Sequence, residues 1–239
     1  LMNDSRTKIL ILVEGAKTDV RLMQKLLTIY NFDQKYELVS YNTNIYTLYD
    51  EMFRDNNPSD LDLLQVLKEH EKDPCKKALF DQVYSDILLI FDLDPQDPSF
   101  TPQKIQRMMD YFVESSDMGK LYLNYPMVEA FYHMQDIPDV HYNAYFAQKS
   151  ELVEGIYKKR VNQENRNGDY RKFAVTREEC NSVIRQNLEK ARWLCSVQDF
   201  IPDGQSILSA ELNYWAQDKI SVLCTCVFYI PEYDSGLIE

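Results

Sequence analysis

The chain has 239 residues, of which 45% are hydrophobic, and its 38 acidic residues outnumber 26 basic residues to give a formal net charge of −12. This length and apolar fraction allow a sizeable core, either one large domain or a domain with an appended lobe. The charge argues against a simple nucleic-acid-binding protein, because phosphate contacts normally need a basic surface.

Neither a membrane span nor a signal peptide is expected, since there is no apolar run of about 18 residues and no basic-then-apolar leader. The five cysteines are odd in number and scattered. This pattern is typical of reduced thiols and favours a cytoplasmic protein.

The first part of the chain predicts a strand, a helix and a second strand. The continuous apolar run that follows Lys8 is typical of a strand buried on both faces, as in a parallel sheet. Apolar residues at helical spacing predict a helix over Thr18–Tyr30, and Tyr36–Tyr41 predicts the next strand. Two helices are expected to follow, at Ile45–Phe53 and Leu61–His70.

A third apolar run, Asp86–Phe91, predicts another buried strand. Prolines interrupt the chain after it and open a helix that runs from about Gln103 to Ser115. Lys120–Leu123 predicts a fourth, short strand. This alternation predicts an α/β fold: a Rossmann-like, mainly parallel four-stranded sheet flanked by helices.

Beyond Pro138 the pattern becomes mostly helical. Helices are expected at Ser150–Glu164, Thr176–Ser196 and Gln205–Gln217, whereas Ser221–Tyr229 fits either a strand or a buried helix. We therefore expect an α/β domain over residues 7–137 and a mostly helical C-terminal lobe over residues 138–239, packed on that domain.

Two of the predicted strands end abruptly at carboxylates. Glu14 ends the first strand, and Asp92 and Asp94 end the third. Ligands of parallel sheets bind outside the carboxyl ends of the strands. Three carboxylates brought together there would repel one another unless they share a cation, so the pattern predicts a Mg²⁺ or Mn²⁺ site. Side chains two residues apart share one side of an extended chain, which lets both aspartates face the same ion.

Six further residues are weaker candidates around this site. Asp19, in the first turn of a helix, and Glu129, in an apolar stretch, are candidate metal ligands. Lys17 could meet a phosphate at a helix N-terminus. The basic stretch Lys158, Lys159 and Arg160 is a candidate contact for a nucleic-acid backbone, although such a stretch is more often a solvated helix face.

Val13-Glu14-Gly15 after one strand, together with Asp92-Leu93-Asp94 after another, resembles the Toprim domain of topoisomerases, bacterial primases and OLD-family nucleases. The segment Glu14-Gly15-Ala16-Lys17-Thr18-Asp19 and the segment Asn124 to Phe131, with Glu129 inside it, are similar to small Toprim-like proteins of the RloB type. The resemblance covers roughly residues 8–135 and does not extend into the C-terminal third.

This resemblance implies a metal-dependent endonuclease in which Glu14 manages a proton or binds metal and Asp92 and Asp94 bind metal. It also implies a role in bacterial anti-phage defence beside an ATPase partner. The sequence does not distinguish DNA, RNA or tRNA as the substrate, and it leaves a homo-oligomer open.

Two alternatives stay open at this point. The chain could be a non-catalytic Toprim-like interaction or regulatory subunit. It could also be a haloacid-dehalogenase-like phosphatase that uses Asp92 and Asp94, although Pro95 and Gln96 stand where that class usually carries Thr or Val. The chain has no P-loop motif and no Gly-x-Ser-x-Gly elbow, so it lacks the signatures of a P-loop ATPase and an α/β-hydrolase.

Overall fold

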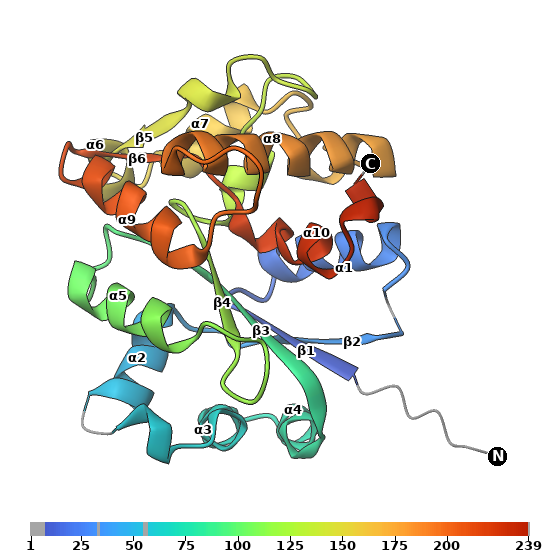
Figure 1. Ribbon diagram of the computed structural model, residues 1–239, viewed down its shortest axis with the longest axis vertical. Helices are drawn as coiled ribbons and strands as arrows, with labels where there is room; N and C mark the ends of the chain where they lie inside the picture. Colours follow the sequence, from blue (N-terminus) through green and yellow to red (C-terminus); the bar gives the residue numbers. More distant parts are fainter. Residues whose placement is uncertain (1–7, 33, 55–56, 239) are drawn as a thin grey trace. The chain divides into compact units, whose positions relative to one another are not determined.

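A computed structural model describes residues 8–32, 34–54 and 57–238. Its central element is a four-stranded parallel sheet in the order β2-β1-β3-β4 (Figure 1). The strands are β1 (Lys8–Val13), β2 (Tyr36–Ser40), β3 (Tyr84–Asp92) and β4 (Lys120–Asn124). The predicted α/β class and the four parallel strands are therefore confirmed, and the arrangement is Rossmann-like.

The strand order reverses direction next to β1. The chain passes from β1 to β2 on one side, and then returns to place β3 on the other side of β1. Both pairings are parallel, with Val13 opposite Ser40 in β2 and opposite Ile90 in β3. The carboxyl ends of β1 and β3 thus flank the point where the order reverses, which is where open α/β sheets bind their ligands.

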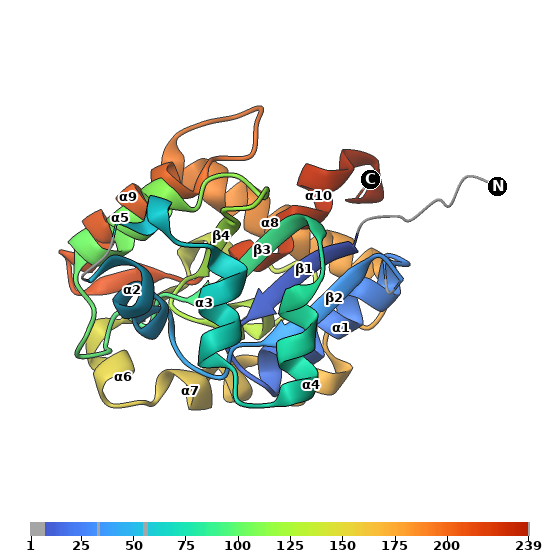
Figure 2. The same ribbon diagram turned by 90° about the horizontal axis from the view of Figure 1, so that it is seen from below.

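Helices cover both faces of this sheet. Helix α1 (Thr18–Ile29) lies on one side of β1 and β2, and α3 (Leu63–His70) and α4 (Pro74–Lys77) lie on the other side (Figures 1 and 2). Helix α2 (Ile45–Phe53) precedes them. Because β1 has helices on both faces, its residues from Ile9 to Val13 are all buried, which explains their unbroken apolar character.

Local capping explains where several helices begin. Asn44 accepts a hydrogen bond from the Thr47 amide at the start of α2, and Asp62 accepts one from Gln65 at the start of α3. Each cap satisfies an amide that has no partner inside its helix. The cap at Asp62 also explains why α3 begins at Leu63, two residues later than the sequence predicts.

The rest of the chain is mostly helical, as expected. It contains α5 (Pro102–Tyr111), α6 (Lys149–Val153), α7 (Tyr157–Glu164), α8 (Arg177–Cys195), α9 (Gly204–Trp215) and α10 (Tyr229–Tyr233). The short strands β5 (Phe146–Gln148) and β6 (Lys219–Ser221) pair antiparallel. Short 3₁₀ turns include η3 (Val128–Tyr132), η5 (Tyr170–Lys172) and η6 (Thr225–Val227).

Two local predictions for this part of the chain need correction. The single helix expected over Ser150–Glu164 is two helices, because Gly155 between them has a φ of 69° that ends α6. The segment Ser221–Tyr229 is neither a strand nor one helix, since β6 ends at Ser221 and the 3₁₀ turn η6 follows.

By its internal contacts the chain divides into two compact units. The first contains the described residues up to Phe91 together with Arg107–Tyr122, and the second contains Asp92–Gln106 and the described residues from Leu123 onward. This division follows packing, and the sequence-based division into residues 7–137 and 138–239 stays a prediction. Of the helices described, none has the length and apolarity that a membrane crossing requires.

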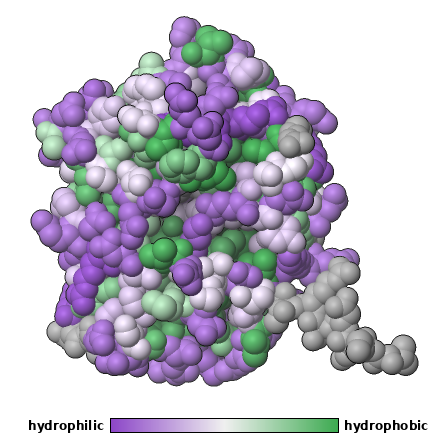
Figure 3. All heavy atoms as spheres, viewed as in Figure 1, coloured by the Kyte–Doolittle hydropathy of each residue, from purple (hydrophilic) through white to green (hydrophobic). Residues whose placement is uncertain are grey.

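On the face drawn in Figure 3, polar residues surround small separate apolar patches.

Candidate metal centre

Glu14 is held at the end of β1 by the neighbouring strands. Its amide donates a hydrogen bond to the carbonyl of Ile90 in β3 at 3.1 Å, and its own carbonyl accepts one from the Asn42 amide at 2.9 Å. The backbone of Glu14 is therefore fixed on both sides. Gly15 follows at a crowded point, since a Cβ there would lie 2.6 Å from the Asp19 carboxylate.

Asp92 is the last residue of β3, two positions after the Ile90 carbonyl that binds Glu14. Its side chain is buried, and its Oδ1 accepts a hydrogen bond from Nδ2 of Asn124 at 3.2 Å. Asn124 is itself completely buried at the end of β4, and its Oδ1 accepts a hydrogen bond from the Cys226 amide. A buried amide with bonds at both ends fixes the orientation of the Asp92 carboxylate.

Asp94 lies on a sharp turn just after β3. It has a φ of 42°, a left-handed conformation that is uncommon for residues other than glycine but tolerated by Asp. Its amide donates to the Pro126 carbonyl at 3.0 Å, and its Oδ1 accepts a hydrogen bond from Gln96. Unfavourable backbone conformations of this kind cluster at functional sites, where neighbouring interactions hold them in place.

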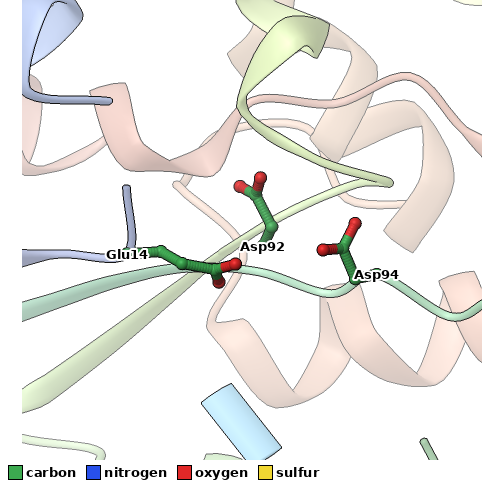
Figure 4. Close-up of side chains that lie close together, drawn as sticks. All are labelled: Glu14, Asp92 and Asp94. Atoms are coloured by element: carbon green, nitrogen blue, oxygen red, sulfur yellow. The ribbon is translucent and has the colours of Figure 1, made fainter. Parts of the chain in front are cut away.

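These three side chains converge. Glu14, Asp92 and Asp94 each offer a carboxylate oxygen, and the three oxygens all lie within 4.8 Å of one another. Figure 4 shows Glu14 extending toward the two aspartates. The structure thus brings together the three residues that the two acidic strand ends predicted to be neighbours.

A lysine supplies positive charge next to these acids. Lys158 on α7 has its Nζ 3.2 Å from Oε1 of Glu129. Burial lowers the pKa of Lys158, but the charge and hydrogen bond of Glu129, with the charges of Asp92 and Asp94, outweigh burial and raise it overall. Its ammonium is therefore held in the charged form by the acidic residues around it.

The pKa of Asp94 is also raised. Burial is the main cause, and the negative charges of Glu129 and Asp97 add to it, while the Gln96 hydrogen bond and Lys158 act in the opposite direction. A carboxylate that is costly to ionise alone becomes easier to ionise beside a cation.

Glu129 lies in η3 and is buried, with 4% of its surface exposed. Its Oε1 faces Lys158, and its Oε2 has no hydrogen-bond partner among the described residues. A buried carboxylate oxygen without a partner is costly, and a cation or an ordered water would satisfy it. Glu129 is not part of the 4.8 Å group, but its charge acts on Asp94.

The remaining predicted site residues lie apart from the carboxylate group. Asp19 is buried in the first turn of α1 beside Gly15 and does not join the group of three. Lys17 is exposed at the N-terminal end of α1, and Lys159 is exposed on α7. Arg160 binds both carboxylate oxygens of Glu151 and the Phe146 carbonyl, so its charge is largely neutralised.

The donor set matches a hard divalent cation. Mg²⁺ and Mn²⁺ prefer carboxylate oxygens, and Glu14, Asp92 and Asp94 supply three at one point. The unsatisfied buried oxygen of Glu129 adds a second observation in favour of a cation nearby. The residues present therefore fit Mg²⁺ or Mn²⁺.

Sequence reasoning did not assign Asn124 a role at the site. The signal was available, because Asn124 ends the fourth strand at the same carboxyl edge of the sheet as Glu14 and Asp92. The sequence makes Lys158 only a weak candidate for contact with nucleic acid, and its pairing with Glu129 cannot be predicted from two residues that lie far apart in the sequence.

Comparisons with protein-family models, with characterised proteins and with solved structures find no match to this chain.

Proposed function

We propose that this protein is a metal-dependent nuclease of the Toprim class. The observation that carries this proposal is the convergence of Glu14, Asp92 and Asp94 within 4.8 Å at the carboxyl ends of β1 and β3. These ends flank the position where the strand order reverses, which is the binding position in sheets of this kind. The proposed family rests on the motifs around Glu14 and Asp92.

Each residue of the site has a proposed task. Asp92 and Asp94 hold Mg²⁺ or Mn²⁺, with Asn124 orienting Asp92. When bound, the ion supplies a more acidic water and compensates charge that develops on a phosphodiester. Glu14, less buried than Asp92, either completes the ligand set or takes the proton of the attacking water.

The acidic composition is compatible with this task if a bound cation or a partner protein helps to bind the negatively charged substrate. A bound cation bridges carboxylates to phosphate, and a partner protein can contribute basic surface. Because the resemblance to RloB-type proteins implies an ATPase partner in bacterial anti-phage defence, we propose that an ATPase supplies this surface.

The direct test is cleavage of labelled single-stranded DNA, duplex DNA, RNA and tRNA with Mg²⁺ or Mn²⁺, alone and with an ATPase encoded beside it. Cleavage that requires the metal and disappears in Asp92→Asn and Glu14→Gln is the expected result. Asp136→Asn, at an exposed position outside the carboxylate group, is the matched control and should cleave normally.

Two outcomes would contradict the proposal. If no nucleic acid is cleaved under any of these conditions, the chain is better described as a non-catalytic interaction subunit. If small phosphomonoesters are hydrolysed, with the activity lost in Asp92→Asn and nucleic acids untouched, a phosphatase replaces the nuclease.

A further inference from the structure

Four aromatic rings and two lysines gather on one surface of the second unit, outside the carboxylate group. They come from the loop before α5, from β5 and α6, and from the adjoining ends of α9 and β6. We call this surface the aromatic–lysine face; it consists of Phe100, Phe146, Lys149, Tyr214, Trp215 and Lys219.

The rings pack in two contacting pairs. Phe100 meets Trp215 edge-to-face with ring centroids 5.9 Å apart, and Phe146 lies 4.9 Å from Tyr214. All four rings are half-buried, so each keeps part of its surface open to solvent. Core aromatics of this protein, such as Phe131, are by contrast completely buried.

The lysines lie over these rings. Lys149 Nζ is 4.9 Å from the centroid of Trp215, and Lys219 Nζ is 4.9 Å from Phe146 and 5.3 Å from Tyr214. The acid paired with Lys149 is Asp218, whose side chain is 80% exposed and therefore binds the lysine weakly. This face carries local positive charge in a chain whose net charge is −12.

Half-exposed rings interleaved with lysines match the chemistry that binds single-stranded nucleic acid. Bases stack on aromatic side chains, whereas ammonium groups bind the phosphates that follow. A lysine lying over a ring can move to a phosphate while a base takes its place, because an exposed cation–π contact is worth only about 0.5–1 kcal/mol. A duplex, whose bases are already stacked, cannot use such rings in this way.

The face is joined to the carboxylate group by a short, ordered segment. The Asp97 amide donates to the Asp94 carbonyl at 2.9 Å, and the Phe100 amide donates to the Asp97 carbonyl at 3.0 Å. Two successive turns thus lead from Asp94 to Phe100. The aromatic–lysine face thus begins at Phe100, six residues after Asp94 along the chain.

From these contacts we propose that the aromatic–lysine face binds single-stranded nucleic acid by base stacking, with Trp215 as its central ring. The choice of nucleic acid as the ligand rests on the proposed nuclease function. Beyond that function, this face would select single-stranded nucleic acid and bind it at a surface separate from the metal ligands.

Tryptophan fluorescence tests this proposal without any cleavage. The chain has two tryptophans, so Trp193→Phe leaves Trp215 as the only one. This variant is titrated in excess EDTA with oligo(dT), oligo(rU) and a duplex, each of about 12 nucleotides. We expect at least one single strand to change the Trp215 emission and to bind more tightly than the duplex, and the tighter of the two is the preferred oligonucleotide.

Binding of labelled oligonucleotide to variants that retain both tryptophans or lose one provides the control. Trp215→Ala should weaken single-strand binding by about tenfold, and Trp215→Phe should largely restore it, since a ring remains for stacking. Trp193→Ala, which removes a half-exposed tryptophan on α8, should bind like the wild type.

The proposal is overturned if Trp215→Ala binds single strands as tightly as wild type, or if the duplex binds as tightly as they do. Because EDTA removes the metal, this result is independent of catalysis. Stacking at Trp215 without any metal-dependent cleavage would refute the nuclease and leave the binding face in place, whereas cleavage without stacking would do the reverse.

Discussion

The ammonium of Lys158 lies 3.2 Å from Oε1 of Glu129. The carboxylate belongs to a 3₁₀ turn that follows β4, and the lysine belongs to α7. The contact places a positive side chain near three acidic residues, Asp92, Asp94 and Glu129, whose charges raise its pKa. Lys158 therefore neutralises part of the charge that a divalent cation would neutralise.

Replacing Lys158 tests whether it competes with the cation. In Lys158→Met we expect Mn²⁺ to bind up to about fivefold more tightly, because a repulsive charge is gone and the 60% exposed lysine contributes at most about 1 kcal/mol. Calorimetric titration with Mn²⁺ measures the change. Lys159→Met, one position along the same helix, should leave the affinity unchanged, and weaker binding in Lys158→Met would contradict this view of the site.

Asn124 is not a proposed metal ligand, but it should affect the metal affinity because it orients Asp92. Asn124→Ala removes the donor to Asp92 Oδ1, so we expect Mn²⁺ affinity to fall by about 10–100-fold, as is typical for residues that orient a metal ligand. Loss of the buried hydrogen bonds should also lower the free energy of unfolding by about 1–3 kcal/mol.

The matched control for that substitution is Asn187→Ala. Asn187 is equally buried and accepts hydrogen bonds from Tyr142 Oη and the Cys224 amide. It should lose a similar amount of stability and keep its Mn²⁺ affinity. If both variants lose metal binding equally, Asn124 acts only through folding.

A buried lysine and glutamate in the second unit provide a test of stability. Lys190 is completely buried and donates to the carbonyls of Tyr142 and Tyr145, and Glu211 accepts from the amide and hydroxyl of Ser221. Each charge favours the ionised form of the other. Lys190→Met removes this charge and leaves two buried carbonyls without their donor, so it should cost about 1–3 kcal/mol in urea unfolding. The double variant Lys190→Met/Glu211→Gln should cost clearly less, and equal losses would refute this electrostatic coupling.

The same pair predicts an unusual pH dependence. Burial raises the pKa of Glu211 to about 7, so its contribution to stability is full below pH 4.5 and is lost as the pH rises to 7. Burial lowers the pKa of Lys190 to about 7, so its contribution is full above pH 10.5 and is lost as the pH falls to 7. Relative to the double variant, the wild type should therefore be least stable near pH 7, which melting temperatures from pH 5 to pH 9 can check. A maximum at pH 7 would contradict this.

Much of the sheet could be predicted because a strand buried on both faces needs an unbroken run of apolar residues, which is visible in the sequence. Residues 9–13 and 87–91 are continuous apolar runs, and each stops at a carboxylate where the strand reaches the ligand-binding edge. The parallel order then follows from the alternation of helices and strands, so Glu14 and Asp92 could be expected at one edge.

What the sequence could not reveal depends on tertiary contacts. The basic stretch at 158–160 looks like one positive patch, yet Lys158 pairs with Glu129 and Arg160 with Glu151. The helix expected over 150–164 breaks at Gly155, whose φ is 69°. The sequence does not predict this break, because a single glycine inside a helix costs only about 1 kcal/mol. The orientation of Asp92 by Asn124 likewise depends on the pairing of distant strand ends.

The most direct test of the metal centre is anomalous diffraction from crystals of the protein soaked in Mn²⁺. We predict an anomalous peak bounded by the carboxylates of Glu14, Asp92 and Asp94, absent in crystals of Asp92→Asn. Ordered carboxylates at saturating Mn²⁺ with no peak between them would contradict it.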